Sequence, residues 1–113
     1  VDELASLMND NTKLLILNSP ANPTGGVLER ADLEAIADLA VKHDVTVLSD
    51  EIYAELLYEG EHISIATMPG MAERTIILDG FSKTYAMTGW RLGYGLFPRD
   101  LGQRGRLGGF GRA

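Results

Sequence analysis

The sequence predicts an α/β fold in which helices cover both faces of a mostly parallel sheet. Three short apolar runs, at 14–17, 45–48 and 75–78, have the length and β-branched content of strands that are buried on both faces. Residues 29–43 lie between the first two runs and repeat apolar side chains at the spacing of one helix face. A strand, a helix and a second strand in this order form a βαβ unit, in which the two strands are parallel.

Local patterns justify the remaining elements. In the helix expected at 29–43, acidic side chains crowd the first turn and basic ones stand in the last, as the helix dipole favours. A second, shorter helix is expected at 65–73, although Pro69 and Gly70 make its boundaries unsafe. A fourth strand is expected at 92–97.

The composition is that of one globular domain: the 113 residues are 45% hydrophobic and 23% charged. The chain has no cysteine, which excludes disulfides and thiolate metal sites. No apolar run approaches the ~18 residues that a membrane span needs, and no signal peptide opens the chain. We therefore expect a cytoplasmic protein with no membrane partner.

Charge divides the chain into two segments. Residues 1–97 carry 6 basic and 15 acidic side chains, and 98–113 carry 4 arginines and Asp100. The acidic segment is expected to be the folded domain, and it argues against nucleic-acid binding as the main activity. The Gly/Arg-rich tail, 98–113, cannot bury a helix face and is expected to be disordered. A truncation or frameshift artefact is favoured over a tail that binds nucleic acid or membrane, because one aromatic makes a poor binding module.

Polar residues follow each apolar run at the point where the expected strand ends. They are Asn18-Ser19, Ser49-Asp50 and Asp79-Gly80. Ligands in open α/β sheets bind beyond the carboxyl ends of the strands, so these polar groups are expected at one edge of the sheet. This arrangement would bring four side chains within reach of each other: Asn22, Asp50, Tyr53 and Lys83.

The loop 18–26, which follows the first run, has two interpretations. Its Asn-Pro and Gly-Gly pairs are typical of a rigid turn. The two prolines could also lock the loop so that the Asn22 amide points inward as a fixed donor. A phosphate-binding P-loop is excluded, because no Gly-Lys-Ser/Thr follows the glycines.

The segment that follows the second run is equally open to two interpretations. Asp50 and Tyr53 are either part of a solvated acidic cap or a carboxylate and a phenol that grip two points of one flat ligand. A metal at Asp50 and Glu51 is disfavoured, because divalent oxygen sites draw on more ligands than one acidic pair. His43 and His62 are expected to be structural or solvated.

Lys83 follows the third run in an aromatic, small-residue segment with no carboxylate between Asp79 and Asp100. It is either a surface lysine of a glycine-rich loop or a nucleophilic amine able to form a Schiff base. Arg91 is either an ion-pair partner or an anion ligand. Each signal alone is weak, but their order after successive strands favours a functional site.

Three motifs together resemble the signature of class I/II aminotransferases, the pyridoxal-phosphate enzymes of the aspartate aminotransferase fold. They are Asn-Pro-Thr-Gly at 22–25, Asp-Glu-Ile-Tyr at 50–53 and Ser-Lys-Thr-Tyr-Ala-Met-Thr-Gly-Trp-Arg-Leu-Gly at 82–93. The resemblance implies an internal fragment of the large, cofactor-binding domain of a fold type I enzyme, with 1–97 as that partial domain.

The resemblance also implies a role for each matching residue. Lys83 would form the Schiff base with pyridoxal 5'-phosphate and later move the substrate's proton. Asp50 would pair with the pyridine nitrogen, and Ile52 would pack on one face of the ring. The remaining contacts would be hydrogen bonds to the phenolic oxygen from Asn22 and Tyr53, and phosphate contacts from Ser82 and Arg91.

The implied reaction moves an amino group between an amino acid and a 2-oxo acid, both small molecules, in a homodimeric parent protein. Other fold type I activities, such as carbon–sulfur lyases, remain alternatives, as does a non-catalytic regulator that retains an aminotransferase-like domain. Several relatives carry a serine where this chain has Gly80. The family's upstream glycine-containing phosphate turn, ring-stacking aromatic residue and substrate-gripping arginine have no match here, so the 113 residues alone are expected to be inactive.

Overall fold

The computed structural model describes residues 1–101, and the part of the predicted tail beyond Leu101 lies outside them. The helices and strands are α1 (Asp2–Leu7), β1 (Leu14–Asn18), α2 (Arg30–Lys42), β2 (Thr46–Asp50), β3 (Thr75–Gly80) and β4 (Gly93–Leu96). Three 3₁₀ turns complete the described chain: η1 (Ala54–Leu56), η2 (Ile65–Thr67) and η3 (Thr88–Trp90).

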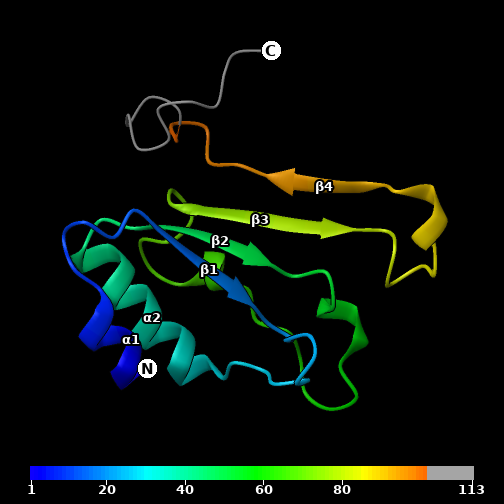
Figure 1. The fold of residues 1–113 in the computed structure, drawn as a ribbon, viewed down its shortest axis with the longest axis horizontal. Coiled ribbons are helices and arrows are strands. Elements are labelled where there is room, and N and C mark those ends of the chain that lie inside the picture. The colour runs from blue at the N-terminus through cyan, green and yellow to red at the C-terminus, as the bar shows by residue number, and fades with distance from the viewer. Residues whose placement is uncertain (102–113) are drawn as a thin grey trace.

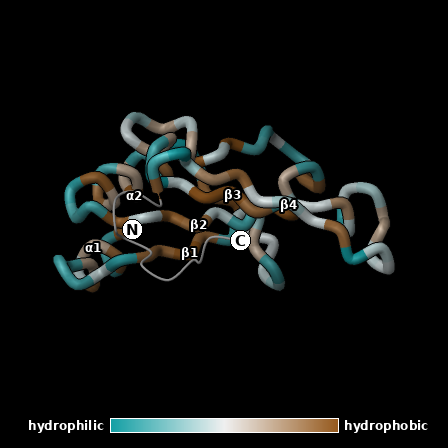
Figure 2. The backbone as a smooth tube through the Cα atoms, turned by 90° about the horizontal axis from the view of Figure 1, so that it is seen from above, coloured by the Kyte–Doolittle hydropathy of each residue, from teal (hydrophilic) through white to brown (hydrophobic). Residues whose placement is uncertain are grey.

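The four strands form one sheet in the order β1-β2-β3-β4 (Figure 1). β1, β2 and β3 are parallel, and β4 is antiparallel to β3. Leu17 lies opposite Ser49, which lies opposite Ile77. β1 and β2 end together at Asn18 and Asp50, and β3 continues to Gly80. Figure 2 shows their apolar stretches as brown segments of the tube. The predicted α/β class and mostly parallel sheet are confirmed.

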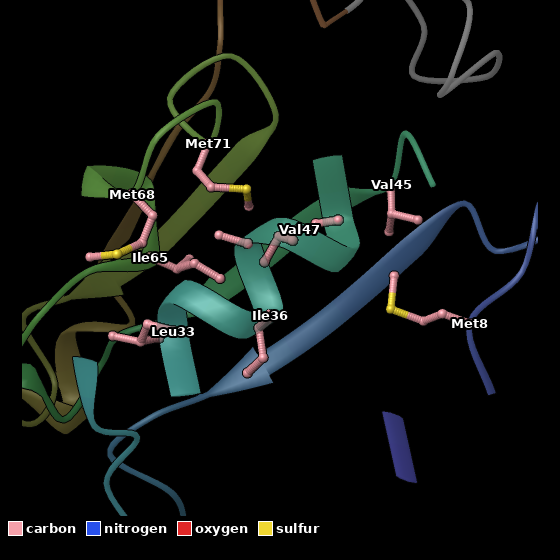
Figure 3. Packing of buried hydrophobic residues seen from close by; sticks show 10 residues of the cluster. Met8, Leu33, Ile36, Val45, Val47, Ile65, Met68 and Met71 are labelled. Carbon is pink, nitrogen blue, oxygen red and sulfur yellow. The ribbon is translucent and has the colours of Figure 1, made fainter. Parts of the chain in front are cut away.

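The helix predicted at 29–43 is α2, and its apolar stripe forms one side of the core. The backbone N–H of Glu29 donates to Asp32 Oδ2 at 3.2 Å, which caps the first turn. The buried face of α2 packs against β2 and the segment around η2 (Figure 3). The cluster consists of Met8, Leu33, Ile36, Ala37, Ala40, Val45, Val47, Ile65, Met68 and Met71.

The predicted helix at 65–73 is wrong in length, since only η2 forms there. Ser64 caps this turn by accepting a hydrogen bond from the Ala66 N–H at 3.3 Å. Pro69 has no N–H to continue a helix, and Gly70 adopts a φ of +73°. The segment therefore turns towards β3, and its Met68 and Met71 are buried as core residues.

The apolar run at 14–17 predicts a strand that is buried on both faces. In residues 1–101, β1 is buried on one face only. Leu15 and Leu17 pack against the core cluster, while Leu14 is 41% and Ile16 64% exposed. β1 is an edge strand of the sheet, and side chains alternate between the two faces of a strand. Both α-helices contribute to the same cluster, through Leu4 of α1 and the buried face of α2.

Candidate functional site

The carboxyl ends of β1 and β2 lie side by side and are joined by a side chain. Asn18 pairs with Asp50 in the sheet register, and Asn18 Nδ2 donates to the Asp50 carbonyl at 3.3 Å. β3 runs beside them, with Leu78 in register with Asp50, and ends two residues further on at Gly80. The predicted convergence of the strand ends is therefore present in the structure.

The loop after β1 holds Asn22 through its own backbone. The Asn22 N–H donates to Asn18 Oδ1 at 2.9 Å, and Ala21 exchanges backbone hydrogen bonds with Gly25 and Gly26. Gly25 has a φ of +72°, which glycine adopts without the penalty that a Cβ brings. The Asn22 side chain is thereby set against the segment that follows β2.

Asn22 and Tyr53, predicted to act together, are in direct contact. Asn22 Nδ2 donates to the Tyr53 hydroxyl at 3.3 Å, although the two residues are 31 positions apart. Tyr53 immediately precedes η1, whose first amide, that of Ala54, is bonded to the Glu51 carbonyl. A phenol and an amide from different strand ends therefore present a shared polar surface.

Asp50 is the last residue of β2 and is half-buried. Its Oδ1 accepts a hydrogen bond from the Ile52 N–H at 3.3 Å. Within the described chain no hydrogen bond reaches Oδ2, so one carboxylate oxygen is available to a ligand.

Lys83 lies in the turn that follows β3, with its Nζ 5.7 Å from the centroid of the Tyr53 ring. Together with Ser82 and Arg91 it lines a cavity of about 380 Å³. Ile52 is part of the same lining, which links this cavity to the end of β2. The amine is exposed, which leaves it accessible to an incoming carbonyl compound.

Arg91, which lines this cavity, has an unusual backbone conformation. Its φ is +53°, in the left-handed region, and it ends the turn η3. Its Nη1 donates to the Thr88 carbonyl at 3.0 Å. The guanidinium keeps further N–H groups free for an anion, and the planar fork suits two phosphate oxygens.

Sequence analysis missed a cluster around Glu51. This carboxylate is 7% exposed, and it accepts hydrogen bonds from Ser49 Oγ at 2.9 Å and Ser64 Oγ at 2.6 Å. His62 Nε2 lies 2.8 Å from its second oxygen. Only the Ser49–Glu51 spacing of two residues on one strand face could have suggested part of it, because the other partners come from a distant loop.

A second polar contact that the sequence did not indicate involves Tyr94 of β4. Its hydroxyl donates to Asp79 Oδ2 at 2.6 Å, and this hydrogen bond raises the pKa of Tyr94 above its ordinary value. Partial burial and the negative charge of the same Asp79 act in the same direction. Antiparallel pairing of β3 with β4 brings the two residues opposite each other.

No helix in the described part of the chain is long and apolar enough to cross a membrane. Among residues 1–101 no three metal-binding side chains gather into a group that could hold an ion. At this end of the sheet the Lys83 amine and the Arg91 guanidinium line one cavity, and the Asn22 amide donates to the Tyr53 hydroxyl.

The chain belongs to the family described as aminotransferase class I and II, whose profile matches residues 1–104. It is 58% identical over 99 residues to an aspartate aminotransferase of Pyrococcus abyssi, covering 87% of this chain and 25% of the relative. It is 50% identical over 100 residues to the arginine–pyruvate transaminase AruH of Pseudomonas aeruginosa, covering 88% and 25%. The chain thus spans about a quarter of the length of these curated relatives.

Solved structures agree with this assignment. The aromatic aminotransferase from Pyrococcus horikoshii superposes with a TM-score of 0.82 at 56% identity, over 86% of this chain and 26% of its own. The N-succinyldiaminopimelate aminotransferase from Mycobacterium tuberculosis reaches a TM-score of 0.86 at 40% identity, over 93% of this chain and 28% of its own.

Proposed function

We propose that the gene product carrying these residues is a pyridoxal-phosphate-dependent aminotransferase that moves an amino group between an amino acid and a 2-oxo acid. The observation that carries the proposal is the hydrogen bond from Asn22 to Tyr53, whose ring lies 5.7 Å from the Lys83 amine. These groups come from the ends of three strands, and no packing requirement of the core explains their chemistry.

The residues present fit the cofactor. Lys83 offers an amine for the aldehyde of the cofactor, and Asp50 a carboxylate oxygen for its ring nitrogen. Asn22 and Tyr53 offer two donors for its phenolic oxygen. Ser82 and Arg91 line the same cavity as Lys83. When bound, the cofactor supplies an electron-withdrawing ring that stabilises negative charge on the substrate's α-carbon.

The chain's own groups then have distinct tasks. The Asp50 carboxylate favours the protonated, positively charged form of a ring nitrogen that faces it. Arg91 neutralises and orients a phosphate through paired N–H donors. The Lys83 amine holds or moves a proton beside the substrate, where its fixed position replaces a bimolecular encounter.

Replacing Lys83 tests the proposal. The full-length gene product, incubated with pyridoxal 5'-phosphate and reduced with borohydride, is expected to carry the cofactor's mass on the peptide that contains Lys83. Lys83→Ala should abolish that label and lower transamination at least ~100-fold, the scale of lost proton transfer. Lys42→Ala, at the exposed end of α2, is the matched control.

Two results would overturn the proposal. One is a label that persists in Lys83→Ala, and the other is a wild-type protein that transfers no amino group from any amino donor to a 2-oxo acid. Accumulation of pyruvate and ammonia in place of a transaminated product would identify the carbon–sulfur lyase alternative.

The remaining expectations are proposals of the same kind. Residues 1–113 expressed alone are expected to show no turnover, because the substrate-carboxylate arginine of the family has no match in them; measurable turnover by this segment would contradict this. A homodimer is expected by sedimentation of the full-length gene product, and a cytoplasmic location by cell fractionation.

A further inference from the structure

We propose that Glu51 is a positioning residue that sets the orientation of Asp50 and Tyr53 without contacting the cofactor. The inference rests on the proposed function, because it assigns Glu51 a task at the same cofactor site. Glu51 does not touch the cavity that Lys83 lines. It acts through its neighbours in the chain.

Both oxygens of the Glu51 carboxylate are engaged, by three partners in all. Ser49 Oγ and Ser64 Oγ donate to Oε1 at 2.9 and 2.6 Å, and His62 Nε2 lies 2.8 Å from Oε2. Ser49 belongs to β2, whereas His62 and Ser64 belong to the loop before η2. A buried carboxylate that meets donors from two segments holds those segments together, because losing any partner leaves a buried polar group unpaired.

The backbone N–H and carbonyl of Glu51 are also hydrogen-bonded. Its N–H donates to the Leu78 carbonyl at 2.9 Å, which extends the pairing of β2 with β3 by one residue. Its carbonyl accepts from the Ala54 N–H at 2.9 Å, which starts the turn η1. Glu51 therefore links β3, η1 and the 62–64 loop at one point.

This point lies between the two side chains that the cofactor site needs. Successive side chains of an extended strand point to opposite faces, so anchoring Glu51 on one face directs the adjacent Asp50 to the other. Tyr53 follows two residues later, within the turn that the Glu51 carbonyl closes. The cluster thereby restrains both the carboxylate and the phenol without contacting the ligand.

The test compares three substitutions in the full-length gene product. Glu51→Ala removes every side-chain contact, and Glu51→Gln retains the shape with one carbonyl oxygen. Ser64→Ala removes one donor to Glu51 together with the cap of η2. Glu61→Gln is the matched control, because Glu61 is exposed in the same loop. Asp50→Asn serves as the reference for damage to the site itself.

Three quantities are measured: the dissociation constant of pyridoxal 5'-phosphate, the absorption band of the bound cofactor, and thermal unfolding without cofactor. Glu51→Ala is expected to weaken cofactor binding roughly tenfold or more, by analogy with the loss found when outer partners of metal-ligating residues are removed. The absorption band should shift as in Asp50→Asn. Glu51→Gln should fall between wild type and Glu51→Ala, and Glu61→Gln should match wild type.

A purely structural role predicts a different pattern, with a lower unfolding temperature but unchanged affinity and absorption band in the folded protein. That pattern in Glu51→Gln and Ser64→Ala overturns the inference, and these two milder variants decide the question if Glu51→Ala does not fold. If Asp50→Asn also leaves affinity and absorption unchanged, the proposed cofactor site itself is overturned. If only Asp50→Asn changes them, the positioning role alone fails.

Discussion

Gly80 illustrates how a single position constrains the site. A Cβ built there would lie 3.1 Å from the Gly93 Cα, 3.1 Å from the Leu92 carbonyl oxygen and 3.3 Å from Ile52 Cδ1. The first two are backbone atoms, which cannot move without disturbing the pairing of β3 with β4. The close approach of the two glycines therefore leaves little room for a side chain at position 80.

Gly80→Ser is therefore expected to destabilise the protein by about 1–3 kcal/mol, the usual cost of overpacking a tight contact. Urea unfolding monitored by circular dichroism measures it. Gly89→Ser is the control, because a Cβ at Gly89 meets nothing within 4 Å. Equal stability of the two variants would show that the β3–β4 approach is not tight.

Tyr94 provides a pH-dependent contact at the same strand pair. Its pKa is raised from 10.0, chiefly by the hydrogen bond to Asp79. A phenol whose folded pKa lies above its unfolded pKa is favoured in its protonated form by folding. The stability from this contact is thus fully present below about pH 10 and is lost as the pH rises through the folded pKa.

Asp79→Asn should lower the pKa of Tyr94 towards 10.0, because it removes the charged acceptor and the negative charge together. An NMR titration of the Tyr94 ring carbons measures this shift. Asp10→Asn, on the exposed chain before β1, should leave the titration unchanged. A Tyr94 titration that is identical in wild type and Asp79→Asn would contradict the assigned cause.

At the scale of elements, α2 is the best-determined part of the fold. Its apolar stripe, its charge distribution and its capping interaction all indicate the same start and end. The structure begins the helix at Arg30 and ends it at Lys42, within one residue of the predicted range 29–43. The prediction of a helix at 65–73 failed, because helix-breaking residues in the segment oppose helix formation. Burial of Met68 and Met71 in the core does not require a helix.

The cap of α2 can be tested directly. Asp32→Ala removes the acceptor of the Glu29 N–H and a negative charge near the helix N-terminus. A loss of about 1 kcal/mol is expected, measured by chemical unfolding. Asp38→Ala, exposed in the middle of the helix, should be neutral or slightly stabilising because alanine has the higher helix propensity. Equal losses in both variants would rule out the cap as the cause.

At the scale of the whole molecule, ten buried hydrophobic residues of the described chain form one cluster between α2, the sheet and the η2 segment. Met71 has no exposed surface and comes from the segment whose helix does not form. Met71→Ala is expected to cost about 2–5 kcal/mol, a large part of a typical domain's stability. Met87→Ala, half-buried and outside the cluster, should cost less. The urea midpoints of Met71→Ala and Met87→Ala are compared. Equal midpoints would contradict the assignment of Met71 to the core.

The sequence by itself determined the order of strands and helix, the parallel pairing, and the candidates Asn22, Asp50, Tyr53 and Lys83. These features follow from local patterns: apolar periodicity, turn residues and polar residues at strand ends. Arg91 was a candidate as well, and the resemblance to class I/II aminotransferases gave Ser82 and Arg91 their phosphate role; both line one cavity with Lys83 in the structure. Their roles towards the cofactor remain predictions.

Only the tertiary structure decided which of these side chains touch. The Asn22–Tyr53 hydrogen bond spans 31 positions and depends on the register of β1 with β2. The Glu51 cluster could not be predicted, because His62 reaches it from a loop whose path no local pattern encodes. Contacts between distant segments depend on how the whole chain packs, whereas elements depend mainly on neighbouring residues, and this difference separates what was predicted from what was not.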